Sequence, residues 1–200
     1  MIQRVRTINM KKTPFNKRKI EKLVRELIVQ LGENPDREGL LGTPKRMADM
    51  YEEIFAGYCM NSELEISFSE ETDSIIAKDI QFYSMCEHHM LPFFGKIHIA
   101  YTPSGKVFGI SKLARLVEKY SKRLQIQERL TKEIADEIMK MGVKGVTVIA
   151  EGEHLCMKMR GVRNNSTIIT IANRGLVDQN DARAHLLALI YDSKPKIHTV

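Results

Sequence analysis

Two short cysteine–histidine clusters, distant from each other in the chain, constrain the fold more than any other feature of the sequence. The first is Cys86-Glu87-His88-His89 and the second is His154-Leu155-Cys156. Structural zinc usually takes four protein ligands, whereas catalytic zinc keeps one position open for water. The count of soft ligands therefore favours an open, catalytic zinc site held by Cys86, His89 and Cys156, and the fold must bring the two clusters together.

The other histidines of the clusters are predicted to stay off the metal. Residues three apart in a Cys-x-x-His turn converge on one ion, so His88 points elsewhere than its neighbour. The segment Glu151–Arg160 alternates like a strand, which places His154 on the same face as Cys156. Arg160 shares that face, roughly 13 Å beyond Cys156 at strand rise. This separation suits an extended anion with a reactive carbon at one end, and it leaves both histidines free to move protons.

A plainer interpretation of the clusters stays open. A lone Cys-x-x-His is a weak signal, and a buried cysteine is often only a small apolar side chain. Cytosolic cysteine patterns nevertheless lean toward metals or catalysis. Cys59 belongs to neither cluster and is expected to be a free thiol without a role.

Composition indicates a globular protein of a reducing compartment. The 200 residues, 43% of them hydrophobic, can bury one good core. No apolar run approaches the roughly 20 residues that span a membrane, and the basic segment 1–19 has no apolar segment behind it, so neither a membrane partner nor a signal peptide is expected. Three cysteines, two of them in a ligand pattern, argue against a disulfide framework and for the cytoplasm.

The net charge of +6 invites a nucleic-acid hypothesis. The basic residues are scattered, however, and the chain has no tryptophan and no aromatic-rich stacking motif. A basic site for a small polyanion explains the charge equally well, so nucleic acid is the weaker interpretation.

Hydrophobic periodicity predicts helices first, then strands, two helices and more strands. Helices are expected over residues 16–31, from 43 to about 57, from 111, from about 127, and over 181–191. Strands are expected over residues 64–68, 75–83, 96–101, 106–108, 145–150, 154–160 and 166–171. Thr43 and Ser111 are expected to cap their helices. This order predicts an α+β domain over residues 63–200, preceded by an N-terminal arm and helical region over residues 1–62.

Two helix starts carry candidate binding groups. Ser111-Lys112-x-x-Arg115 combines free helix amides with two cations, which suits a phosphate, although a capped amphipathic helix explains it as well. Gln127-Glu128 opens the next helix, where a carboxylate could pair with the edge of a guanine. On local evidence the simpler explanation of Glu128 is an acid placed at the positive end of a helix dipole.

Five motifs occur in a characteristic order and spacing along the chain. They are Gly42-Thr43-Pro44-x-Arg46, Ser84-x-Cys86-Glu87-His88-His89-x-x-Pro92, Gly109-Ile110-Ser111-Lys112, Gln125-x-Gln127-Glu128-Arg129-Leu130-Thr131 and His154-x-Cys156-x-x-x-Arg160-Gly161-Val162-Arg163. Any one of them is modest evidence, but five together are highly specific. From about Ile20 to Ile190 the sequence resembles the GTP cyclohydrolase I family.

The resemblance implies a fold, an assembly and residue roles. The fold would be the T-fold, or tunnelling fold, with an antiparallel sheet and helices on one face. Members of this type form homodecamers of two face-to-face pentamers, with active sites at subunit interfaces. By this resemblance Cys86, His89 and Cys156 would bind zinc, and His88 and His154 would transfer protons. Glu128, with Gln127 beside it, would bind the guanine. The triphosphate would be bound by Lys112, Arg115 and Arg160, together with Arg46 from a neighbouring subunit, and Ser111 would position the ribose-phosphate end.

The implied reaction is the zinc-dependent hydrolysis of GTP at C8 with release of formate. An Amadori rearrangement and ring closure then give 7,8-dihydroneopterin triphosphate, the first step of tetrahydrofolate and pterin biosynthesis. One alternative is a non-catalytic purine-nucleotide-binding T-fold protein with structural zinc, for which His154 or His88 would be a fourth ligand. Another is the related nitrile reductase of queuosine synthesis, which needs a cysteine nucleophile and a nicotinamide cofactor and has no use for this zinc set.

Overall fold

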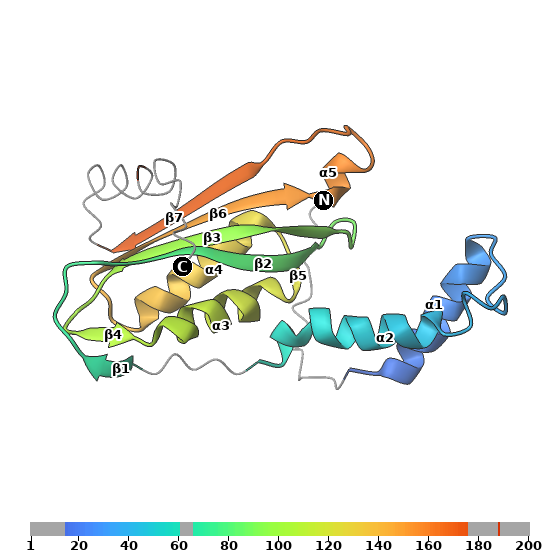
Figure 1. Ribbon diagram of the computed structural model, residues 1–200, viewed down its shortest axis with the longest axis horizontal. Coiled ribbons are helices and arrows are strands. Elements are labelled where there is room, and N and C mark those ends of the chain that lie inside the picture. Colours follow the sequence, from blue (N-terminus) through green and yellow to red (C-terminus); the bar gives the residue numbers. More distant parts are fainter. Residues whose placement is uncertain (1–14, 61–65, 176–187, 189–200) are drawn as a thin grey trace, which may run out of the picture. The chain divides into compact units, whose positions relative to one another are not determined.

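The computed structural model describes residues 15–60, 66–175 and 188, and the chain divides into two compact units, Met1–Cys59 and Met60–Val200 (Figure 1). The helix expected over residues 181–191 lies outside the described residues, apart from residue 188. Within the described ranges, no helix has the length and apolar character needed to cross a membrane.

The N-terminal unit contains a pair of helices and a short 3-10 turn. Its elements are α1 (Lys17–Gln30), α2 (Thr43–Ile54) and η1 (Ala56–Tyr58). The Asn16 side chain accepts a hydrogen bond from the Lys19 amide at 3.0 Å and so caps α1. Gly32 follows α1 with a φ of +83°, a conformation that favours glycine and ends the helix where the sequence predicts.

The predicted cap of α2 is wrong. Gly42 occupies the N-cap position without a side-chain hydrogen bond, and Thr43 is the first helical residue. Pro44 lies in the first turn, where its missing amide proton costs nothing and its fixed φ suits the helix, so the start needs no hydroxyl cap. The Thr43 hydroxyl oxygen instead accepts a hydrogen bond from the Arg46 guanidinium at 3.1 Å.

The C-terminal unit is built on a five-stranded sheet with the order β5-β2-β3-β6-β7 (Figure 1). The neighbouring pairs are antiparallel except for the short parallel pair of β5 with β2. A separate two-stranded sheet pairs β1 with β4. The bounds are β1 (Ile66–Ser69), β2 (Ile75–Cys86), β3 (Pro92–Thr102), β4 (Lys106–Phe108), α3 (Ile110–Ser121), β5 (Leu124–Gln125), α4 (Gln127–Lys140), β6 (Gly145–His154), α5 (Leu155–Lys158) and β7 (Ile168–Gly175). The predicted α+β class is confirmed.

The core lies between the sheet and helices α3 and α4, which cover one of its faces (Figure 1). Fully buried side chains come from both layers: Phe82, Phe93, Ile97, Ile99, Val146 and Val148 from strands, and Leu113, Leu116, Leu130, Ile134 and Ile138 from helices. Each such side chain stabilises the fold by roughly 1.5–3 kcal/mol. This packing holds the strand ends that carry the two cysteine–histidine clusters.

The strand predicted over residues 154–160 is wrong. β6 continues without a break from Gly145 to His154, and the chain then turns into α5, which carries Cys156. Arg160 follows in the turn after α5, so the separation derived from strand rise does not apply. Leucine, methionine and lysine form helices readily, and four residues of apparent alternation cannot outweigh that preference once the sheet has ended.

The predicted cap of α3 is also wrong. Gly109 is the N-cap residue, α3 begins at Ile110, and no side chain makes a capping hydrogen bond. Ser111 is therefore the second helical residue, and it is exposed.

Candidate functional site

The turn between β2 and β3 presents the first cluster. β2 ends at Cys86, whose carbonyl accepts hydrogen bonds from the amides of His89 at 3.4 Å and Met90 at 2.8 Å. Met90 has a φ of +51°, and the Cys86 amide then donates to the Leu91 carbonyl at 2.9 Å. The chain thus reverses tightly around Cys86, and this reversal places the two predicted ligands of the turn side by side.

The register of the sheet brings the second cluster to the same place. Phe93, just after the turn, pairs with His154 at the end of β6, and α5 then carries Cys156 back over this end of the sheet. The Cys86 sulfur lies 3.9 Å from the Cys156 sulfur and 3.9 Å from Nδ1 of His89. One ligand atom from each of Cys86, His89 and Cys156 lies within 4.8 Å of the other two. The three side chains could therefore hold one metal ion.

The spacing of these atoms fits zinc. Zinc–sulfur distances of about 2.3 Å and zinc–nitrogen distances of about 2.0–2.1 Å in a tetrahedron place ligand atoms roughly 3.5–3.8 Å apart. Burial, followed by the neighbouring Cys86 sulfur, raises the pKa of the Cys156 thiol, while Arg160 opposes that rise. A cation between the sulfurs would reverse this preference, since metal-bound thiols are deprotonated.

The two remaining histidines have different surroundings. His88 is exposed on the turn, with Nδ1 3.9 Å from the Cys86 sulfur. His154 is half-buried, and its ring stacks on Phe93 with the centroids 4.6 Å apart and the planes 6° from parallel. Burial lowers the pKa of His154, and the Glu128 carboxylate opposes that shift. Both rings thus lie near the cluster, but only His154 is held by packing.

Gln127 precedes the exposed Glu128 in the sequence, but its own side chain is buried. Its side chain is 1% exposed, and its amide nitrogen donates to the carbonyls of Ala150 at 3.0 Å and Ile168 at 2.8 Å. Its amide oxygen lies 2.9 Å from Nε2 of His154. Every polar atom of this side chain is therefore engaged within the protein, which local sequence reasoning missed.

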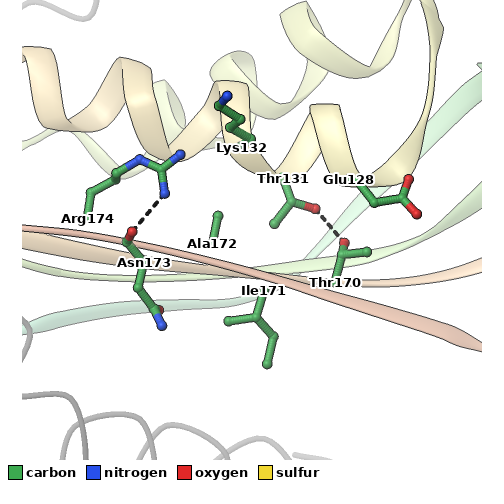
Figure 2. A pocket seen from close by; sticks show the side chains of 8 residues that line it. All are labelled: Glu128, Thr131, Lys132, Thr170, Ile171, Ala172, Asn173 and Arg174. Carbon is green, nitrogen blue, oxygen red and sulfur yellow. Dashed lines mark hydrogen bonds between the residues drawn. The ribbon is translucent and has the colours of Figure 1, made fainter.

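Glu128 is exposed in the first turn of α4, at one end of a pocket of about 360 Å³ between α4 and β7 (Figure 2). The other lining residues are Thr131, Lys132, Thr170, Ile171, Ala172, Asn173 and Arg174. The hydroxyls of Thr131 and Thr170 hydrogen-bond across the pocket floor at 2.6 Å (Figure 2). None of the three metal-cluster residues lines this pocket, so Glu128 alone among the predicted site residues borders it.

The predicted phosphate-binding cations come from separate elements. Lys112 and Arg115 lie in the first turns of α3, and Arg160 is exposed after α5. Arg46 belongs to α2 in the N-terminal unit, where its guanidinium also donates to the Gly39 carbonyl at 3.2 Å. None of Lys112, Arg115 and Arg160 lines the pocket that Glu128 borders.

A salt bridge ties the metal-cluster turn to α4, and sequence reasoning missed it. The Arg129 guanidinium donates to both carboxylate oxygens of Glu87, at 2.5 and 3.0 Å. This pairing holds the pKa of the Glu87 carboxyl below its usual range. Both residues stand inside the quoted motifs, but only their opposite charges could have suggested a contact between segments so far apart.

Comparison with known proteins identifies the family. The family model for GTP cyclohydrolase I matches residues 20–191. The chain is 54% identical to GTP cyclohydrolase 1 of Hyperthermus butylicus over 170 residues, covering 84% of this chain and 88% of that protein. It is also 54% identical to GTP cyclohydrolase 1 of Carboxydothermus hydrogenoformans over 187 residues, covering 90% and 97%. An archaeosine synthase QueF-Like structure in the apo form aligns with a TM-score of 0.44 and 17% identity, over 54% of this chain and 99% of that one. The chain belongs to the GTP cyclohydrolase I family.

Proposed function

We propose that the protein hydrolyses GTP at C8 of the purine, releases formate and yields 7,8-dihydroneopterin triphosphate. The family match over most of the chain supports this reaction. The observation that carries it is the convergence of Cys86, His89 and Cys156 next to a packed, half-buried His154. This is the donor set of an open zinc site with a proton-transfer group beside it.

We infer that Cys86, His89 and Cys156 hold Zn²⁺. When bound, the ion supplies a Lewis acid with one coordination position for water. Two thiolates and one neutral imidazole leave the set one ligand short of a closed structural site. His88 and His154 stay off the metal and are the proton-transfer residues.

Recognition of the substrate is divided among the remaining candidates. Glu128, exposed near His154, accepts hydrogen bonds from the N1–H and exocyclic amine of guanine. Lys112, Arg115 and Arg160 bind the triphosphate, and Ser111 positions the ribose-phosphate end. Arg46 contributes to the triphosphate site of a neighbouring subunit.

The reaction needs several proton transfers in one pocket. Water adds at C8, and His154 or His88 protonates a ring nitrogen, so that the imidazole ring of the purine opens to a formamide. A second hydrolysis releases formate. The ribose then opens, rearranges as an Amadori product and closes onto the free amine. General acid–base catalysis of this kind contributes about 10²–10⁴-fold to a step, which explains why the site needs more than one histidine.

The family also suggests how the protein is assembled. We propose a T-fold catalytic domain over residues 63–200, an N-terminal arm and helical region over residues 1–62, and a homodecamer of two pentamers in the cytoplasm with active sites between subunits. Among the described residues β5 and β7 are the edge strands of the sheet, an arrangement compatible with strands that continue across subunits.

Formate release from GTP by purified protein of known zinc content tests the function. The expected result is one formate per GTP together with a pterin chromophore, both lost in His154→Ala with zinc retained. Formate without a pterin would confine the activity to ring opening. No formate from zinc-loaded protein would contradict the proposed reaction and favour a nucleotide-binding protein with structural zinc.

A further inference from the structure

The Gln127 side chain connects three elements in the interior. From the first residue of α4, its amide nitrogen donates to the Ala150 carbonyl in β6 and to the Ile168 carbonyl in β7, and it lies 3.3 Å from the Thr170 hydroxyl. Its oxygen meets Nε2 of His154, at the very end of β6. The side chain is 1% exposed, so none of these contacts competes with bulk water.

The chemistry of these partners fixes which way the amide faces. The backbone carbonyls of Ala150 and Ile168 can only accept hydrogen bonds, so the Gln127 nitrogen must face them. The amide oxygen therefore faces His154, and an amide oxygen can only accept. Nε2 of His154 must then carry the proton of this hydrogen bond, and Nδ1 is the ring nitrogen that does not contact Gln127.

Two neighbours show that the arrangement is built into the fold. A Cβ atom on Gly152 would lie 2.2 Å from the Gln127 oxygen, so only glycine leaves room for the amide there. The Phe93 ring, 0% exposed, stacks on the His154 ring and fixes its plane. The hydrogen bond that His154 donates to Gln127 and this stacking together leave the imidazole one orientation.

We propose that Gln127 is a positioning residue that accepts a hydrogen bond from Nε2–H of His154 and thereby orients the ring so that Nδ1 faces the substrate during GTP hydrolysis. The inference rests on the proposed function. It replaces the role of a guanine-reading group that the sequence suggested for Gln127. The hydrogen bond between Nε2–H and the Gln127 oxygen keeps this orientation of the ring.

Steady-state kinetics of the zinc-loaded protein distinguish a role of Gln127 in positioning His154 from a role in binding guanine. Gln127→Met keeps the length of the side chain but removes both hydrogen-bonding groups, and we expect kcat to fall about 10–100-fold with little change in KM. Gly152→Ala should act in the same direction by displacing the Gln127 oxygen, without altering Gln127 or His154. The matched control is Ser121→Ala, since Ser121 at the end of α3 is 2% exposed and its hydroxyl donates to the backbone carbonyl of Glu118 rather than to a group of the candidate site.

Substrate preference gives a second readout. Inosine triphosphate lacks the exocyclic amine of guanine, so a guanine-reading residue must affect the preference for GTP. Under the proposal, Gln127→Met lowers kcat for both nucleotides and leaves their ratio unchanged, whereas Glu128→Gln reduces the ratio. A raised KM for GTP and a reduced preference in Gln127→Met would overturn the proposal.

The tautomer itself can be observed. In zinc-loaded protein labelled with ¹⁵N-histidine, the His154 signals are those missing from His154→Ala. We expect a protonated Nε2 and an unprotonated Nδ1 in the wild type, and a mixture of tautomers in Gln127→Met. A wild-type proton on Nδ1, or no change in the variant, would contradict the inference while formate release from wild type still supports the reaction. Absence of formate from wild type would instead refute the proposed function.

Discussion

At the scale of single residues, the sulfur atoms of Cys86 and Cys156 lie where they can oxidise to each other. They lie 3.9 Å apart without a disulfide between them, and Cys59 is a third free thiol, exposed in the other unit. A metal ion between the two sulfurs would hold both as ligands and prevent their oxidation. The metal should therefore govern the redox state of this pair.

Removal of the metal by a chelator in air should convert Cys86 and Cys156 to a disulfide. Each thiolate loses one electron to dioxygen, and the 3.9 Å separation needs only a small movement to form the bond. Thiol titration of denatured protein should then find one free thiol, Cys59, in place of three. Protein kept in zinc is the control and should retain all three, and three free thiols after chelation would refute the prediction.

His98 is a histidine in β3 that is 1% exposed. Its Nδ1 accepts a hydrogen bond from the Asp79 amide at 3.2 Å, and burial lowers its pKa despite the opposing carboxylates of Glu151 and Asp79. Protonation at Nδ1 would break this hydrogen bond. Because the folded pKa lies below the unfolded value of about 6.5, the contribution to stability is complete above that pH and is lost as pH falls through the folded pKa.

Thermal unfolding of zinc-saturated protein between pH 7.5 and about 5 checks this expectation. The wild type should lose stability on acidification, and His98→Gln should lose less, because glutamine can still accept from the Asp79 amide but does not take up a proton. The metal ligands titrate equally in both proteins, so the difference between them isolates His98. Parallel curves for the two proteins would be the contrary result.

At the scale of elements, the site depends on where β2, β6, α4 and α5 begin and end. The Glu87–Arg129 salt bridge joins the turn after β2 to the first turn of α4, and Gln127 joins the same turn of α4 to the end of β6. The start of α4 therefore contacts both cysteine–histidine clusters, the first at Glu87 and the second at His154. The register of β3 with β6 brings the two clusters together, and α4 adds contacts to both.

Arg129→Met should weaken zinc binding more than it weakens the fold. Both side chains of the salt bridge are partly exposed, so its loss should cost about 0–1 kcal/mol of stability. Glu87 directly follows Cys86, so loss of its partner should loosen the turn that presents the ligands and lower zinc affinity by up to about tenfold. Competition with a chromophoric chelator would measure this change.

A matched control for Arg129→Met lies on the same helix. Asp136→Asn weakens the contact of α4 with Arg174 in β7, where Nε lies 2.6 Å from the carboxylate. Its zinc affinity should equal that of the wild type. Equal losses of affinity in the two variants would indicate a general loosening of α4 rather than a specific tie to the turn.

At the scale of the whole molecule, the chain consists of two compact units, and the predicted site residues are divided between them. Arg46 lies in the N-terminal unit, while the metal cluster, His154 and Glu128 lie in the C-terminal unit. The proposed contribution of Arg46 to a neighbouring subunit's site would make the oligomer, rather than the single chain, the functional unit.

Mixing of inactive variants tests that division. Oligomers assembled from equal amounts of Arg46→Ala and His154→Ala chains contain some sites with both native residues, and random mixing should restore about a quarter of wild-type formate release. A mixture of Cys156→Ser with His154→Ala is the control and should stay inactive, since both changes affect the same chain's half of the site. No recovery in the first mixture would place Arg46 and His154 in sites formed by one and the same chain, or leave Arg46 without a role.

Local patterns determined much of this protein from the sequence alone. The periodic apolar residues define α1, alternation locates β2 and β4, and the Cys-x-x-His spacing indicates a turn that presents two donors to one point. The motif order also indicated the family that the comparisons establish. These features depend on residues a few positions apart, so a single sequence contains their cause.

Tertiary structure decided what depends on distant partners. The segment after His154 alternates like a strand but becomes α5, because the sheet ends there and no neighbouring strand continues to pair with it. β5 is too short to be recognised and exists because β2 pairs with it. Gln127 looked like a ligand-binding neighbour of Glu128, yet carbonyl groups of β6 and β7 draw its amide into the interior. Hydrogen bonds between segments far apart in the chain leave no local pattern, so only the folded structure shows them.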